Sequence, residues 1–258
     1  TDDDLLATLG RLHSYNEFVV AYNLLRESGI HNINIDLMFG LPNQTFQQWQ
    51  DTLDRVLKLE PDHISAYGLK VEEGTPFYEL DEKGLLQLPD EDVERDMYHY
   101  LIQKISEVGY SQYEISNFSK KGSASKHNMI YWKNEDYLGM GLGAHGSFKG
   151  KRVANIVDKV SYEKMCHSGN KPIETVEVID EAERMYETVI LGLRLNQGVS
   201  IAEFDRRYNQ SFRAYYGDTV DSLVMKGLLE SLDDYVRLTE YGRDISNQVM
   251  AEFIKEDL

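Results

Sequence analysis

Apolar and polar residues follow two different periods that alternate along the first half of the chain. From Ser14 to Gly29 the apolar residues recur every three or four positions behind a potential capping box, which predicts a helix. Residues 31–37 then alternate strictly, with isoleucine and leucine on one side and Asp36 on the polar side, which predicts a strand. The first half therefore starts with a helix that leads into a strand.

The same succession recurs further along the chain. A second capping box at Thr45 opens the next helix, residues 63–70 predict a second strand, and a helix capped near Asp90 precedes a third strand at 110–116. The first two strands begin about 30 residues apart, the length of a βαβ unit with parallel strands. Such units are typical of a (β/α) barrel. Three strands cannot close a barrel, so the free edge of the sheet needs a cover from another segment or subunit.

Beyond residue 146 the pattern changes to ribbons and helices. A hairpin that turns at Lys149-Gly150 is predicted over 147–156, followed by a helix at 158–166 and a polar linker, HSGNKPIET. Further helices are predicted at 180–195, 200–208 and 211–228, and a last one starts at Thr239. A short ribbon, LLESLDDYVRL, precedes the last helix, so this part resembles a winged helix.

We therefore predict an α/β fold in three parts. Residues 1–146 form part of a (β/α) barrel, residues 147–179 a hairpin and linker, and residues 180–258 a mostly helical domain with a short β-wing. Nucleic-acid binding is a natural hypothesis for such a wing, but residues 181–258 carry 9 Lys and Arg against 15 Asp and Glu. A DNA-binding domain needs a basic face, so a structural or substrate-covering role is favoured.

Composition narrows the function further. The chain carries 27 Lys and Arg against 44 Asp and Glu, a net charge of −17, which disfavours nucleic acid and anionic membranes as partners. It has no apolar run of membrane-spanning length and no signal sequence, so a cytoplasmic location is expected. Cys166 is the only cysteine, and one thiol can form neither an internal disulfide nor the ligand set of an iron–sulfur cluster.

The segment from His127 to Gly146 has the composition of a ligand site. It combines two histidines with Tyr131, Trp132, Tyr137 and four glycines. Aromatic faces contact flat ligands, glycines let a backbone approach closely, and a neutral imidazole can bind iron. A buried histidine with a tight turn and an aromatic core patch explains the same residues equally well, so spacing alone leaves both interpretations open.

Asp36 stands near the carboxyl end of a predicted parallel strand, where barrel enzymes place their working residues. If that face is buried, its carboxylate needs a partner, such as a ligand's amino group or ribose hydroxyls, a lysine or an arginine. Arg11 is a candidate partner, and it could instead hold a ligand carboxylate or lie on the surface of a helix. The sequence contains no phosphate-loop, dinucleotide-binding or GxSxG motif, so the pattern leaves the reaction class open.

Five segments occur in the order and spacing of one family. They are NIDLMFGLPNQT (34–45), HISAYGLKVEEGTPFY (63–78), YSQYEISNFSKKG (110–122), HNMIYW (127–132) and YLGMGLGAHG (137–146). With them the chain resembles, along essentially its whole length, the heme chaperone HemW family of radical S-adenosylmethionine (SAM) proteins, which is related to oxygen-independent coproporphyrinogen III oxidase. The resemblance implies the C-terminal part of a radical SAM partial barrel, followed by a winged-helix-like domain.

The resemblance also implies cofactors and site residues. The family carries a 4Fe–4S cluster on a C-x-x-x-C-x-x-C motif that this chain lacks. About the first third of the family's length is therefore expected to be absent, and the chain alone is expected to hold no cluster and to bind SAM weakly or not at all. Arg11 and Asp36 match the family's SAM-contacting residues, and His127 opens the HNxxYW motif to which heme binding is attributed.

These matches favour a heme-binding chaperone that delivers heme to an acceptor protein. The alternative enzyme is oxygen-independent coproporphyrinogen III oxidase of porphyrin biosynthesis, and the alternative without catalysis is a winged-helix interaction module. Heme or a porphyrin is the expected ligand, and the chain by itself is expected to be inactive as a radical SAM enzyme. Whether it forms a homo-oligomer stays open.

Overall fold

Contacts between residues divide the chain into two units, residues 1–124 and residues 125–258. The structure is a computed structural model that describes residues 1–254, so the last four residues of the predicted 180–258 part lie outside the described residues. The boundary falls after Ala124, which groups the predicted hairpin and linker with the last part of the chain. The three-part division of the sequence stays a prediction about folding units.

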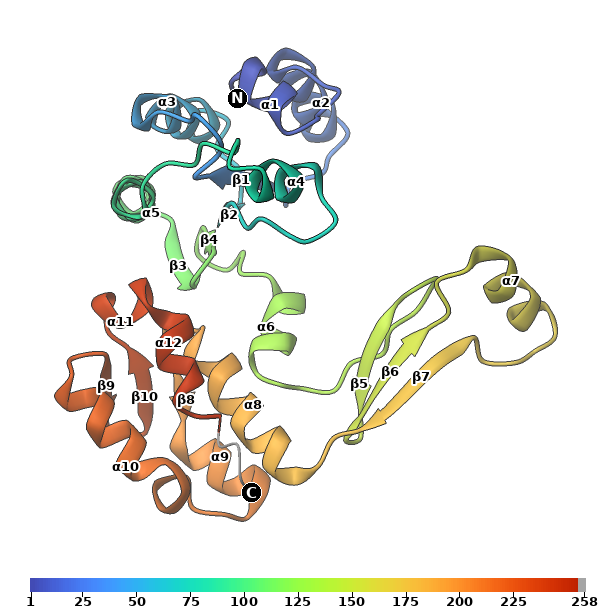
Figure 1. Cartoon of the computed structure of the whole chain (residues 1–258), viewed down its shortest axis with the longest axis vertical. Coiled ribbons are helices and arrows are strands. Elements are labelled where there is room, and N and C mark those ends of the chain that lie inside the picture. Colours follow the sequence, from blue (N-terminus) through green and yellow to red (C-terminus); the bar gives the residue numbers. More distant parts are fainter. Residues whose placement is uncertain (255–258) are drawn as a thin grey trace. The chain divides into compact units, whose positions relative to one another are not determined.

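The first unit alternates helices with strands. Its elements are α1 (Asp3–Thr8), α2 (Tyr15–Glu27), β1 (Asn34–Phe39), α3 (Phe46–Leu57), β2 (His63–Gly68), α4 (Pro76–Glu82), α5 (Glu91–Glu107), β3 (Ser111–Glu114) and β4 (Asn117–Ser119). Both predicted capping boxes are present, at the start of α2 and of α3. The strands form one sheet in the order β1-β2-β4-β3 (Figure 1), in which β1 and β2 are parallel, as the βαβ spacing predicts.

The end of this sheet differs from the expected parallel repeat. The predicted strand at 110–116 is β3 with a turn, and the chain folds straight back into β4, which lies antiparallel between β2 and β3. Two residues join β3 to β4, whereas a parallel pair needs a crossover of a dozen residues or more. The pattern missed β4 because a strand of three residues is too short to show a period.

The sheet of the first unit has one apolar face and one polar face. Ile35 and Leu37 of β1 are buried on the apolar face, together with Trp49 and Leu53 of α3 and Met97 of α5. Complete burial of a side chain of this size contributes about 1.5–3 kcal/mol, so this face supplies much of the stability of the unit. The polar face takes the alternate positions of β1 and β2, and the parallel register sets them side by side.

The second unit contains two further sheets among helices. Its elements are α6 (Lys126–Trp132), β5 (His145–Phe148), β6 (Lys151–Asn155), α7 (Lys159–His167), β7 (Ile173–Val178), α8 (Glu181–Leu193), β8 (Val199–Ser200), α9 (Ile201–Tyr208), α10 (Phe212–Met225), β9 (Leu229–Leu232), β10 (Tyr235–Leu238), α11 (Glu240–Asp244) and α12 (Ser246–Ala251). The sheets have the orders β5-β6-β7 and β8-β10-β9 (Figure 1). The helices α8 to α10 with the β9–β10 ribbon agree with the predicted winged-helix pattern.

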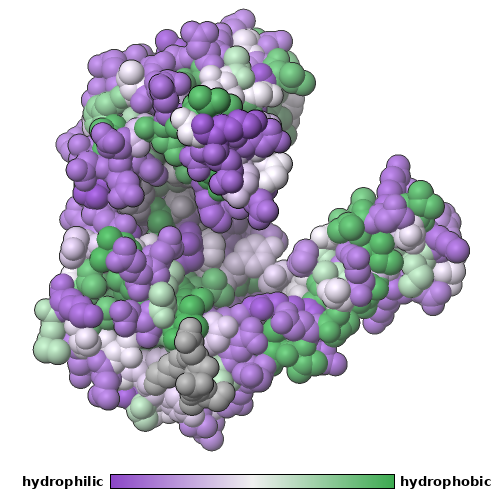
Figure 2. Space-filling model, viewed as in Figure 1, coloured by the Kyte–Doolittle hydropathy of each residue, from purple (hydrophilic) through white to green (hydrophobic). Residues whose placement is uncertain are grey.

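The β5–β6 hairpin turns where the sequence predicts it. Lys149 and Gly150 both have positive φ, 50° and 72°, as a type I′ turn requires. The predicted linker HSGNKPIET is partly wrong, because β7 begins at Ile173 and pairs with β6 as a third strand. Apolar side chains gather on the surface of this sheet and of α7 (Figure 2), including the exposed Val160 and Val178.

Candidate functional site

The HNMIYW motif forms the short helix α6, whose exposed side carries an aromatic cluster. Ser125 caps the helix by accepting a hydrogen bond from the backbone N–H of Asn128 (3.3 Å). His127 is exposed, and its Nε2 lies 2.7 Å from the hydroxyl oxygen of Tyr131, one helical turn further on. Tyr137 packs edge-on against Tyr131 with 4.7 Å between ring centroids, and burial raises the pKa of Tyr137. An accessible imidazole thus contacts one tyrosine ring, which packs in turn against a second.

Trp132, the last residue of the motif, packs against the helical part of the unit. Trp132 is five positions after His127, about 140° around the helix, so it points away from the imidazole. The Arg194 guanidinium lies over the Trp132 ring, 4.4 Å from its centroid, and the indole Nε1 is buried with no hydrogen-bond partner among the described residues. Trp132 therefore fastens α6 to the helical part of the unit, which leaves His127 and Tyr131 on the exposed side.

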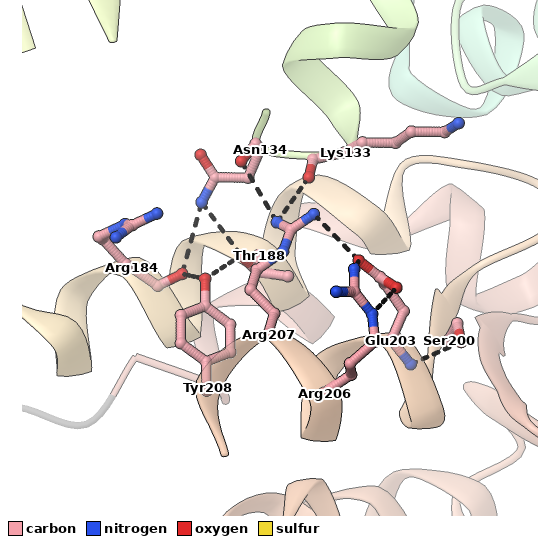
Figure 3. A network of polar contacts seen from close by, with 9 residues as sticks. All are labelled: Lys133, Asn134, Arg184, Thr188, Ser200, Glu203, Arg206, Arg207 and Tyr208. Carbon is pink, nitrogen blue, oxygen red and sulfur yellow. Dashed lines mark hydrogen bonds and ion pairs between the residues drawn. The ribbon is translucent and has the colours of Figure 1, made fainter. Parts of the chain in front are cut away.

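The turn after α6 is also fastened, through polar contacts. Arg207 of α9 donates hydrogen bonds to the backbone oxygens of Lys133 (2.9 Å) and Asn134 (3.3 Å), and its guanidinium lies 3.7 Å from Glu203 (Figure 3). The Asn134 amide donates to Thr188 of α8 (3.1 Å). A cavity of about 470 Å³ adjoins these groups. Since Arg207 and Glu203 are already engaged within the chain, we interpret this network as the support of α6.

Gly139, between α6 and β5, and Gly146 of β5 allow close packing of backbone against backbone. A Cβ atom on Gly139 would lie 2.2 Å from the backbone oxygen of His145, and one on Gly146 would lie 2.8 Å from the backbone nitrogen of Gly139. His145 is the first residue of β5 and is exposed. For these glycines and His145 the structure thus supports a tight turn rather than a ligand site. His145 is not a core residue, because its side chain is exposed. The ligand interpretation keeps His127, Tyr131 and Tyr137.

On the polar face of the first sheet, Asp36 is the end of a hydrogen-bond chain. The Asn34 amide nitrogen donates to Asp36 Oδ1 (2.6 Å), and the Asn34 amide oxygen lies 2.6 Å from Nδ1 of His63. Nε2 of His63 lies 2.8 Å from the Tyr113 hydroxyl, and Ser65 donates to the Asn34 oxygen (3.2 Å). Four polar side chains are therefore connected to one exposed carboxylate.

The carboxylate of Asp36 fixes which groups donate and which accept along this chain of hydrogen bonds. Because Asn34 gives its N–H to a carboxylate, its oxygen must accept, so the proton of His63 sits on Nδ1. Nε2 then accepts from Tyr113. Burial lowers the pKa of His63, which favours the neutral ring, and the negative charge of Asp36 opposes this in part. Sequence reasoning missed His63, Asn34 and Tyr113, although the alternation of the strands at 31–37 and 63–70 places the first two on one face.

Arg11 does not join this group. It lies exposed in the turn after α1, where its backbone N–H donates to Leu6 (2.9 Å). Within residues 1–254, no hydrogen bond or ion pair connects Arg11 with Asp36. The hypothesis that Arg11 pairs with Asp36 is therefore wrong for this structure, in which Asn34 is the partner of Asp36.

The residues present do not fit an iron–sulfur cluster. Cys166 is exposed at the end of α7, and no group of three His, Cys, Asp or Glu in the described part of the chain is placed to hold a metal ion. We therefore derive no step through a cluster. Across residues 1–254, each helix is too short or too polar to cross a membrane.

Comparisons with known proteins relate the chain to HemW and HemN proteins. Residues 179–245 match the family model described as the HemN C-terminal domain. The heme chaperone HemW of Bacillus subtilis (strain 168) is 38% identical over 99% of this chain and 67% of its own length. The HemW proteins of Lactococcus lactis and Escherichia coli (strain K12) are 34% and 29% identical over 98% of the chain and 66% of their own lengths. The chain thus spans about two thirds of these relatives.

A solved structure shows the same fold. Coproporphyrinogen III oxidase (HemN) from Escherichia coli, a radical SAM enzyme, superposes with a TM-score of 0.77 at 19% sequence identity. The match covers 98% of this chain and 61% of that one. At this identity the likeness concerns the fold, and it agrees with a partial barrel followed by a helical domain.

Proposed function

The chain belongs to the heme chaperone HemW family, and from this premise we propose that it binds heme through His127 and passes it to an acceptor protein. The observation that carries the proposal is the exposed imidazole of His127 on a helix that Trp132 and Arg207 fasten at its other end. Imidazole is a common ligand of heme iron. An exposed ligand suits a carrier, because a heme that must be handed over has to remain accessible.

The aromatic surroundings support the same proposal. The Tyr131 ring packs edge-on against both His127 and Tyr137, and aromatic side chains provide apolar contact to a porphyrin plane. We place this exchange in the cytoplasm, where a net charge of −17 also keeps the chain away from anionic membranes and nucleic acid.

The polar face of the first sheet fits a nucleoside ligand. Asp36 is exposed there, and Asn34 occupies one of its carboxylate oxygens, which leaves the other for an amino group or a hydroxyl. We propose that Asp36, together with Arg11, contacts SAM in a protein that also holds the cluster. SAM on a cluster would supply radical chemistry. The cysteines for that cluster are absent from this sequence, so coproporphyrinogen oxidation is not proposed for this chain.

A hemin titration tests the proposal. We expect saturable binding with a shift of the Soret band, and a loss of affinity of more than about tenfold in His127→Ala, since one iron ligand is removed. His145→Ala is the matched control, because His145 is also exposed in the same unit. Equal titrations for His127→Ala and the unaltered chain would remove His127 as the ligand.

A further inference from the structure

The Tyr131 hydroxyl is within hydrogen-bond distance of Nε2 of the His127 imidazole. Its oxygen lies 2.7 Å from that nitrogen. Within residues 1–254, neither this hydroxyl nor the His127 ring has another hydrogen-bond partner in the chain. A neutral imidazole has one available nitrogen lone pair, which can accept a hydrogen bond or bind iron but not both. With the ring proton on Nδ1 this lone pair is on Nε2, so the Tyr131 hydroxyl and an iron ion compete for the same atom.

The tyrosine is the fixed member of this pair. Its ring packs edge-on against Tyr137, and Tyr137 is held by two backbone hydrogen bonds to Ser147 of β5, of 2.6 and 3.0 Å. His127, by contrast, is exposed, and among residues 1–254 the hydrogen bond and the ring contact of its imidazole are both with Tyr131. When a heme leaves, the hydroxyl is already in place to take Nε2 back.

We propose that Tyr131 is a release device for heme: its hydroxyl donates to Nε2 of His127 and competes with the heme iron. The inference rests on the proposed function and assigns the regulation of the same site. A neutral hydrogen bond corresponds to a change of about two- to tenfold in an equilibrium constant. Tyr131 thus weakens heme binding by this factor, which helps a carrier to give up its cargo.

Substitution of Tyr131 by Phe removes the competing hydroxyl and keeps the ring. We expect Tyr131→Phe to bind hemin about two to ten times more tightly than the unaltered chain and to transfer it to apomyoglobin more slowly by a similar factor. The Soret maximum should stay in place, because His127 remains the ligand. Tyr241→Phe is the matched control: it removes a hydroxyl from an exposed tyrosine of the same unit, on α11 and outside the aromatic cluster, and should change neither affinity nor transfer rate.

A measurement without heme tests the hydrogen bond itself. Nitrogen-15 NMR of the histidine rings should show His127 with its proton on Nδ1 in the unaltered chain, and a move of that proton toward Nε2 in Tyr131→Phe. Equal or weaker hemin binding by Tyr131→Phe would overturn the release role while the proposed function stands. A shifted Soret band would do the same, because it would make Tyr131 an iron ligand. If the unaltered chain takes up no hemin, the proposed function and this inference fall together.

Discussion

His63 in the first unit and His127 in the second each contact a tyrosine hydroxyl, at 2.8 and 2.7 Å, yet the two histidines differ in every other respect. His63 is 4% exposed, both of its ring nitrogens are engaged, and its neighbours lead on to Asp36. His127 is exposed and has one partner. His63 therefore has a structural role, whereas His127 is accessible to a ligand.

The difference follows from the element that carries each residue. His63 lies on an inner strand between β1 and β4, so its ring has neighbours on both sides. His127 lies at the start of a seven-residue helix that is fastened at its far end. A histidine with both nitrogens satisfied and no exposure has no lone pair to offer to iron. Exposure, and a lone pair held by a single hydrogen bond rather than buried within the sheet, thus distinguish the ligand candidate from the structural histidine.

The largest expected effect separates the two histidines by stability. His63→Ala removes the imidazole that bonds to both Asn34 and Tyr113 and opens a cavity, so we expect a loss of about 1–3 kcal/mol in the free energy of unfolding. His127→Ala changes a surface position and should stay within about 0.5 kcal/mol. Urea denaturation measures both. Hemin affinity should fall in His127→Ala and stay unchanged in His63→Ala. Equal stability losses in the two variants would contradict the comparison.

The next effect is a dependence of stability on pH. Because the folded-state pKa of His63 is lowered by burial, the unfolded chain takes up a proton first as the pH falls. The contribution of His63 is complete above its ordinary pKa of about 6.5 and is lost on acidification toward the folded value, with a slope of at most about 1.4 kcal/mol per pH unit. Denaturation from pH 8 to 5 should show this slope reduced in His63→Gln and retained in His127→Gln. An unchanged slope in His63→Gln would show that His63 is not a buried neutral histidine.

Apart from the parallel pairing of β1 and β2, which the βαβ spacing predicts, the features that the sequence predicted correctly are local. The capping boxes of α2 and α3, the alternation of β1 and the turn at Lys149-Gly150 each depend on residues within four positions of one another. The features that it missed depend on distant partners. β4 is inserted beside β2, and β7 pairs with β6 across the intervening α7, which no short-range pattern encodes.

The candidate sites follow the same rule. His127 was found through the resemblance of its motif, and the contact with Tyr131 could have been predicted from their spacing of four on a helix. The partners of Asp36 could not, because His63 is 29 residues from Asn34 and meets it only through the register of β1 and β2. For Arg11 the sequence left a pair with Asp36, a contact to a ligand carboxylate and a surface position open, and the structure places its side chain on the surface without the pair.

The smallest expected effect tests the connection between His63 and Asp36. Asn34→Ala removes the amide that accepts from His63 and donates to Asp36, and we expect a loss of about 0.5–1.5 kcal/mol in the free energy of unfolding. It should also release the proton of His63 from Nδ1, which nitrogen-15 NMR detects, whereas the signals of His127 should not move. Asn32→Ala is the matched control, because Asn32 is an exposed residue that precedes β1. If Asn34→Ala leaves the His63 ring protonated on Nδ1 as before, the amide does not orient the histidine, and the first unit has no continuous path from Tyr113 to Asp36.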